Sequence, residues 1–170
     1  MTFRLKVPLF VSKQHMRHRT WSYNEISRRY TDFNIEFYEP QAFRTQHESN
    51  RQASTEEWVD PKVIYHQVPD GASSTASQLI KNHHRSSLRL YNSLIIAGVC
   101  REQARGVLPQ NLYTEYYGTA NLNNLLKFVS LRVHEGAQWE IQQVAKAVLE
   151  ITEELFPITV KAFKEQQNVV

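Results

Sequence analysis

The sequence predicts an α+β fold in which several helices pack on an antiparallel sheet. Apolar and polar residues alternate over residues 2–7, which is typical of a half-buried strand. Apolar residues instead recur every three or four positions over about 75–98 and from Trp139 onward, which is typical of helices with one buried face. A chain of 170 residues suits one domain with a single core, so we assign residues 1–170 to one domain.

The N-terminal part of the chain is expected to form a strand, a helix, a loop and a second strand. The first strand covers residues 1–8 (MTFRLKVP), and the helix runs from Pro8, which suits a first helical turn, to about Arg19. A polar loop follows. Residues 33–40 (FNIEFYEP) are predicted to form the second strand, which ends at Pro40.

The middle of the chain is expected to hold a long excursion and a long helix. Residues 41–75 are polar, lack a clear period and contain the turn signal Asp70-Gly71. We interpret them as a surface excursion or lid, since such long loops in compact domains usually have a function. The helix over about 75–98 ends near Gly98. Its predicted core positions are Ile80, Leu88, Tyr91, Leu94 and Ile95.

The C-terminal part is expected to form one strand and two helices. Residues 112–119 (LYTEYYGT) are strand-like, and Asn121 is well placed to cap the helix that follows. Asn121, Leu125, Phe128 and Arg132 then lie on one stripe of that helix. The helix from Trp139 is closed by Pro157 and is expected to pack in the core or at a subunit interface.

Composition excludes several classes of protein. One cysteine excludes a disulfide framework and favours a reducing, cytoplasmic location. No apolar run approaches a membrane span, so no membrane partner is expected. Cys100 lies in the apolar run LIIAGVC and is expected to be a buried small hydrophobe. His134 and the pair His83-His84 are expected on the surface, and no metal site is predicted because none has a suitably spaced partner ligand.

The most informative segment is RHRTWSYNEISRRY, residues 17–30. It holds four arginines, one histidine and one carboxylate, which together indicate an anion-binding site rather than a core segment. Guanidinium groups match phosphate oxygens two at a time and stay charged, so the arginines suit a nucleotide phosphate. Ser27 can donate to a phosphate or base, and Glu25 can accept from a ring or ribose donor. Upstream, Gln14, Arg17 and His18 would share one face of the predicted helix.

These motifs resemble those of the flavin-dependent thymidylate synthases. The resemblance rests on residues 17–30, on residues 101–132 (REQARGVLPQNLYTEYYGTANLNNLLKFVSLR), and on HEGAQWEIQQ at 134–143. FRTQHESNRQAS at 43–54 also resembles a family segment, to which we assign no role. The resemblance implies methylation of dUMP to dTMP, with methylenetetrahydrofolate as carbon donor, FAD as hydride carrier and NADPH as reductant. It also implies a homotetramer with active sites shared between subunits.

The resemblance further implies a role for individual residues. The dUMP contacts would come from Gln14, His15, Met16, Arg17, Glu25, Ile26, Ser27, Arg28, Arg29, Arg105 and Arg132. The run from Glu25 to Arg29 would reach dUMP from a neighbouring subunit. The FAD contacts would come from Arg17, His18, Arg19, Glu25, Asn121, Leu122, Asn123 and Lys127.

Arg132 would be the catalytic residue, because activation of the uracil ring places negative charge on its amide system and a fixed guanidinium stabilises that charge. This chemistry needs no thiolate, so we expect Cys100 to have no catalytic part.

Two alternatives remain open from the sequence. The family usually carries some tens of further residues before the segment matched here, including a His-x-Thr-Pro element, so we expect an N-terminally truncated domain. The alternative function is therefore a catalytically defective homologue that keeps nucleotide binding or assembles with a full-length subunit. A weaker alternative is a basic RNA- or DNA-binding module, for which Trp21, Tyr23 and Tyr30 could supply stacking surfaces. The net charge of +3 is mild and favours small anionic nucleotides over a nucleic acid polymer.

Overall fold

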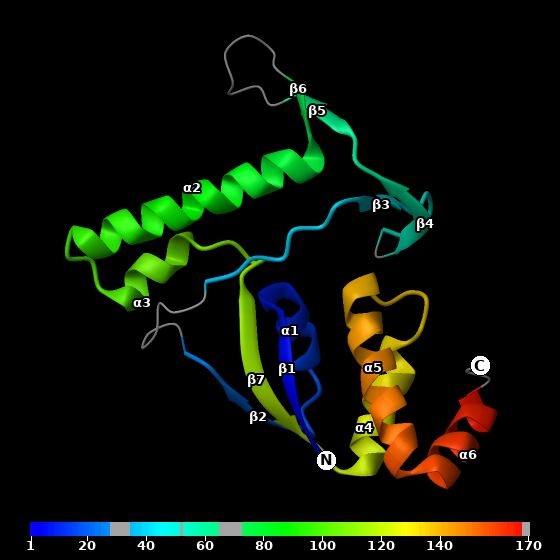
Figure 1. Cartoon of the computed structure of the whole chain (residues 1–170). Coiled ribbons are helices and arrows are strands. Elements are labelled where there is room, and N and C mark those ends of the chain that lie inside the picture. The colour runs from blue at the N-terminus through cyan, green and yellow to red at the C-terminus, as the bar shows by residue number, and fades with distance from the viewer. Residues whose placement is uncertain (28–34, 52, 65–72, 168–170) are drawn as a thin grey trace.

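A three-stranded antiparallel sheet lies at the centre of the computed structural model, which describes residues 1–27, 35–51, 53–64 and 73–167. β7 (Tyr113–Thr119) is the middle strand, between β1 (Thr2–Pro8) and β2 (Ser22–Glu25). The alternation seen in β1 has the expected effect, because Phe3, Leu5 and Val7 are buried and the residues between them are exposed. One face of the sheet is therefore apolar, and helices cover it (Figure 1).

The covering helices are α1 (Leu9–His15), α4 (Leu122–Arg132) and α5 (Trp139–Leu155). α4 and α5 have the predicted bounds. The Asn121 side chain caps α4 by accepting from the Asn124 backbone N–H at 2.9 Å. A further helix, α6 (Pro157–Gln167), begins at Pro157 and was not predicted. Its Val160 is fully buried in the core cluster, which is how α6 is held against the rest of the domain.

The first helix is shorter than predicted, since it ends at His15 and not near Arg19. The chain turns after Met16, where the His18 backbone N–H donates to the His15 carbonyl at 3.0 Å. The Tyr23 hydroxyl donates to the carbonyls of His15 and His18, at 2.7 and 3.2 Å. The loop predicted after this helix is also wrong in part, because Ser22–Glu25 pairs with β7 as an edge strand.

The predictions of a strand over residues 33–40 and of an excursion without strands over 41–75 are both wrong. In the described part of 33–40, Phe37 forms only an isolated bridge with Leu112 in place of a strand. The predicted excursion contains two hairpins, one of β3 (Phe43–Gln46) with β4 (Ser54–Val59) and one of β5 (Lys62–Ile64) with β6 (Ser73–Thr75). The β3–β4 hairpin reaches the start of α5, where the Trp58 and Trp139 rings meet edge to face at 5.3 Å.

The long helix α2 (Ala76–Ile96) has the predicted position, followed by α3 (Arg101–Ala104) and the 3₁₀ turn η1 (Arg105–Val107). Its buried face is different from the predicted one. His84, Ser87 and Tyr91 are buried, whereas the other predicted core positions are half-buried. His84 is not on the surface, because its ring stacks on Phe37 at 4.7 Å and its Nδ1 lies 3.2 Å from a Glu39 carboxylate oxygen. Cys100 is exposed, which corrects the expectation of a buried thiol.

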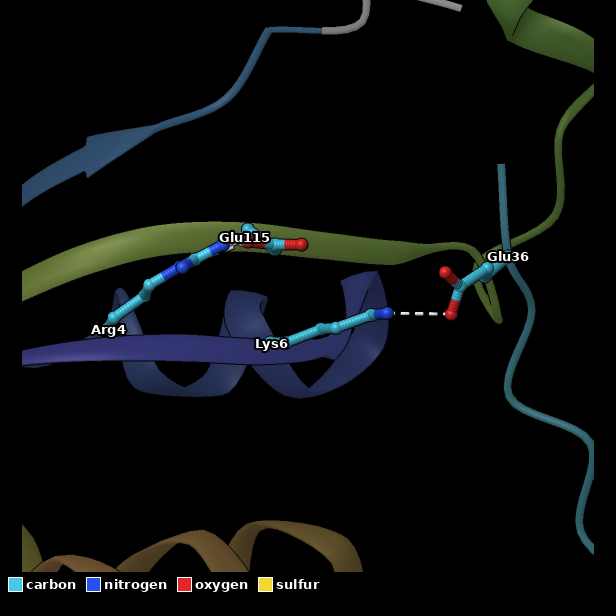
Figure 2. A network of polar contacts seen from close by, with 4 residues as sticks. All are labelled: Arg4, Lys6, Glu36 and Glu115. Atoms are coloured by element: carbon cyan, nitrogen blue, oxygen red, sulfur yellow. Dashed lines mark hydrogen bonds and ion pairs between the residues drawn. The ribbon is translucent and has the colours of Figure 1, made fainter. Parts of the chain in front are cut away.

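The outer face of the sheet carries a charged network (Figure 2). Arg4 on β1 pairs with Glu115 on β7 at 2.6 Å, and Lys6 pairs with Glu36 at 2.6 Å. All four side chains are at least one third exposed, so solvent screens both pairs and they contribute little to stability. No helix in the described ranges has both the length and the apolar character needed to cross a bilayer.

Candidate functional site

Arg132, at the last turn of α4, meets the end of α1. Its Nε donates to His18 Nε2 at 3.1 Å, and its Nη2 donates to the backbone carbonyl of Gln14 at 3.2 Å. His18 accepts this bond only as a neutral imidazole. Burial, and secondarily the charge of Arg132, lowers the pKa of His18 and so favours that neutral form. Arg132 is thereby held in one orientation by two groups of the motif, although it lies more than a hundred residues away in the chain.

His15 occupies the core beneath this turn. Its side chain is fully buried, and its Nδ1 lies 2.8 Å from the Tyr116 hydroxyl. Burial is the largest cause that lowers the pKa of His15, to about 3. The side chain of His15, which was predicted to contact dUMP, thus faces the core of this chain. Met16 is half-buried and packs against the same core.

A cavity of about 940 Å³ opens beside Arg132. Its α4 wall includes Asn123, Lys127 and Arg132, which are three of the predicted site residues. Its other wall comes from α6, with Phe163 as an apolar surface, and from Asn50 at the tip of the β3–β4 hairpin. The α6 wall was missed in the sequence, although Pro157 as a helix start and the spacing of Val160 and Phe163 are helix signals.

The other predicted FAD contacts do not line this cavity. The Asn121 Oδ1 caps the helix by accepting from the Asn124 N–H, and its NH2 group can donate to a ligand. Leu122 is half-buried, whereas Arg17 and Arg19 are exposed in the turn after α1.

A second cavity, of about 500 Å³, lies at the other group of predicted residues. It is lined by Glu25, Ile26 and Ser27 from the end of β2, together with Arg105 from η1. Glu25 is oriented by the Thr114 hydroxyl, which donates to its carboxylate at 2.7 Å. Arg28 and Arg29 lie outside the described residues.

Seven predicted residues thus line two different cavities: Asn123, Lys127 and Arg132 line one, and Glu25, Ile26, Ser27 and Arg105 line the other. The cavity at Arg132 and the cavity at Arg105 have no lining residue in common. Each of the two cavities thus has an arginine and hydrogen-bonding side chains in its lining. Cys100 lines neither cavity, and its Sγ lies 3.6 Å from a Gln103 side-chain oxygen.

Comparisons with known proteins show which family the chain resembles. Residues 1–158 match the family model described as thymidylate synthase complementing protein. The flavin-dependent thymidylate synthase of Thermus thermophilus is 43% identical over 163 residues, which cover 96% of this chain and 56% of the relative. The corresponding enzyme of Kosmotoga olearia is 40% identical, over 95% of this chain and 66% of the relative. The chain thus spans little more than half of the Thermus protein's length.

A solved structure is similar over almost the whole chain. The UMP/dUMP methylase PolB from Streptomyces cacaoi, bound with 5-Br UMP, superposes with a TM-score of 0.79 and 30% identity. The match covers 97% of this chain and 72% of the PolB chain.

Proposed function

Because the chain belongs to the family of thymidylate synthase complementing proteins, the flavin-dependent thymidylate synthases, we propose that it acts in the reductive methylation of dUMP to dTMP. The carbon donor is methylenetetrahydrofolate, and NADPH supplies the reducing equivalents. The observation that carries this proposal is the fixed Arg132 guanidinium beside a large open cavity.

The cavity at Arg132 fits a flavin nucleotide. Leu126 and Phe163 supply apolar surface for a planar ring, while Asn123 and Lys127 supply an amide and a cation for polar and phosphate groups. Bound FAD would supply a hydride, which side chains cannot provide. We assign its binding to Asn123 and Lys127, with Asn121, Leu122, Arg17, His18 and Arg19 as further predicted contacts. Glu25, also a predicted FAD contact, lines the cavity at Arg105.

Arg132 acts on the pyrimidine in this proposal. Negative charge develops on the uracil amide system when the ring is activated for methylation, and a donor already in place stabilises it without reorganising. His18 and the Gln14 carbonyl hold the guanidinium, so its orientation is set before the ligand arrives. Burial lowers the pKa of Arg132, yet an arginine stays charged at any cellular pH.

The separation of the two cavities supports a shared active site. Arg132 and Lys127 line one cavity, and Arg105 and Ser27 line another, so no one cavity of a single chain holds all four. We propose that the Arg132 group of one subunit and the Arg105 group of another enclose the same dUMP in a homotetramer. Symmetric oligomers form such composite sites readily, because one interface repeats.

Calorimetric titration of the chain with dUMP tests this proposal. We expect binding by the unsubstituted chain, binding weakened at least tenfold in Arg132→Ala, and unchanged binding in Arg85→Ala, an exposed α2 arginine. With FAD, folate and NADPH supplied, Arg132→Ala should lower dTMP formation about a hundredfold. Absence of dUMP binding by the unsubstituted chain would contradict the proposal, and binding without turnover would favour a defective homologue that keeps its nucleotide site.

A further inference from the structure

A line of hydrogen bonds leads from Gln14 away from the site. Gln14 Nε2 donates to Gln138 Oε1 at 2.5 Å, and Gln138 Nε2 donates to Glu140 Oε2 at 2.9 Å. The Tyr38 hydroxyl donates to the other oxygen of Glu140, Oε1, at 3.3 Å. These residues come from the end of α1, the start of α5 and the segment before β3, three parts of the chain that Figure 1 shows near the top of α5.

The chemistry of Glu140 sets the direction of every bond in this line. A carboxylate has no proton to donate, so both neighbours must donate to it. Burial, and then the nearby Glu140 charge, raises the pKa of Tyr38 to about 12, which keeps its hydroxyl protonated. Gln138 must therefore turn its NH2 group toward Glu140 and its oxygen toward Gln14.

The consequence reaches the site through Gln14. Because Gln138 offers an oxygen, Gln14 must turn its NH2 group toward it, which leaves Gln14 Oε1 as the free end of the amide. The backbone carbonyl of the same residue accepts from Arg132. Gln14 therefore contacts Arg132 through its backbone, while its side-chain Oε1 has no partner among the described residues.

We propose that Gln138 and Glu140 are positioning residues, which orient the Gln14 amide so that the site selects a ligand with a hydrogen-bond donor facing Gln14. The selected group is an N–H or O–H of the nucleotide. This inference rests on the proposed function for the identity of the ligand, dUMP. It concerns two residues outside the predicted site, both in the HEGAQWEIQQ segment.

Glu140→Gln removes the directional constraint while keeping the shape of the side chain. The new amide can donate or accept, so Gln138 and Gln14 can adopt either orientation. We expect dUMP to bind about fivefold more weakly, the scale of one hydrogen bond. Glu150→Gln is the matched control, because it removes the same charge from an exposed position of the same helix, and its dUMP affinity should be unchanged.

Substitution of Gln14 separates orientation from charge. Gln14→Glu can only accept, so the Gln138 oxygen that faces residue 14 loses its donor while Glu140 still requires the Gln138 NH2 group. In the double variant Gln14→Glu/Glu140→Gln the whole line can reverse, with Gln138 donating to residue 14. Glu140→Gln should therefore weaken dUMP binding in the natural background and strengthen it in the Gln14→Glu background. If Glu140 acted only through its charge on an anionic ligand, its removal would strengthen binding in both backgrounds, and that result would overturn the proposal.

Side-chain amide signals of Gln14 in nuclear magnetic resonance spectra test the line without any ligand. They should shift in Glu140→Gln and in Gln138→Ala, whose side chain is exposed and whose loss the fold should tolerate, but not in Glu150→Gln. Unchanged Gln14 signals in both would overturn the proposal whatever dUMP does. If the signals shift as expected but the unsubstituted chain binds no dUMP, the proposed function fails and the orientation of Gln14 stands. Two dUMP analogues, one methylated at the ring N3 and one lacking the 3′-hydroxyl, identify the selected group. The analogue that lacks the selected N–H or O–H should bind with equal affinity to the unsubstituted chain and to Glu140→Gln. If neither analogue does so, the proposed selection is overturned.

Discussion

His15 is a polar residue in an aromatic environment. Its ring centroid lies 4.5 Å from those of Trp21 and Phe128, and 5.3 Å from that of Tyr23. Its Nε2 has no hydrogen-bond partner within the described structure, while Nδ1 contacts the Tyr116 hydroxyl. The imidazole therefore behaves as a neutral packing group, and its protonation would place an unsolvated charge in the core.

The free energy of unfolding should therefore depend on pH through His15. Its pKa falls from 6.5 in the unfolded chain to about 3 in the fold, so the unfolded state binds more protons between these values. The contribution is fully present above pH 6.5 and decreases as the pH falls toward 3, with a loss of roughly 2 kcal/mol by pH 5. Denaturant unfolding at several pH values across this range should show that the free energy of unfolding changes less steeply with pH in His15→Gln than in the unsubstituted protein. An identical slope in both proteins would show that His15 does not titrate in this way.

Cys100 offers a second test at the scale of single residues. It is exposed and lines neither cavity, so it should take no part in catalysis. Cys100→Ala should keep the dUMP affinity, the rate of dTMP formation and the melting temperature of the unsubstituted chain. A folded variant that binds dUMP but has lost turnover would instead point to a covalent mechanism.

At the scale of elements, α4 brings together stability and function. Its first turn is capped by Asn121 and its last turn carries Arg132, so the position of the helix determines where the guanidinium lies. Leu125, Phe128 and Val129 are fully buried between these ends, which holds the helix against the sheet.

Loss of the Asn121 cap should destabilise the fold measurably. Asn121→Ala removes the acceptor for the Asn124 N–H and should cost about 1 kcal/mol. For a chain of this size the melting temperature should fall by about 2–4 °C. Asn123→Ala, at an exposed position two residues later, should leave the melting temperature unchanged. Asn121→Ser should retain most of the stability, because serine also caps helices. Equal melting temperatures for the two alanine variants would argue against the cap.

At the scale of the whole molecule, the two arginine groups lie at separate cavities of one chain. The proposed composite site makes a strong prediction for mixtures of variants. An Arg132→Ala chain and an Arg105→Ala chain should each bind dUMP poorly alone. After subunit exchange, about a quarter of the sites in a random mixture should pair an intact Arg132 with an intact Arg105.

Calorimetry of the mixed sample should therefore recover dUMP binding at a reduced number of sites. Mixing the Arg132→Ala chain with an Arg132→Lys chain is the matched control, since no pairing in that mixture regenerates an intact site. If subunits exchange and no binding returns, each site must be built within one chain.

Local sequence patterns determined much of this protein. The alternation in residues 2–7 predicted β1, and the three-to-four period predicted α2, α4 and α5, because the side-chain period of an element is a local property. The side-chain types of residues 17–30 indicated anion binding for the same reason: guanidinium and hydroxyl chemistry does not depend on the fold.

Only the tertiary structure decided how these parts meet. α1 ends at His15, whose carbonyl accepts from the Tyr23 hydroxyl, and His84 is buried because Phe37 and Glu39 cover it. The bond between Arg132 and His18, and the line from Gln14 to Glu140, each join residues over a hundred positions apart. Such contacts depend on how the chain packs rather than on its local period, so the separation of the two arginine groups could be seen only in the folded molecule.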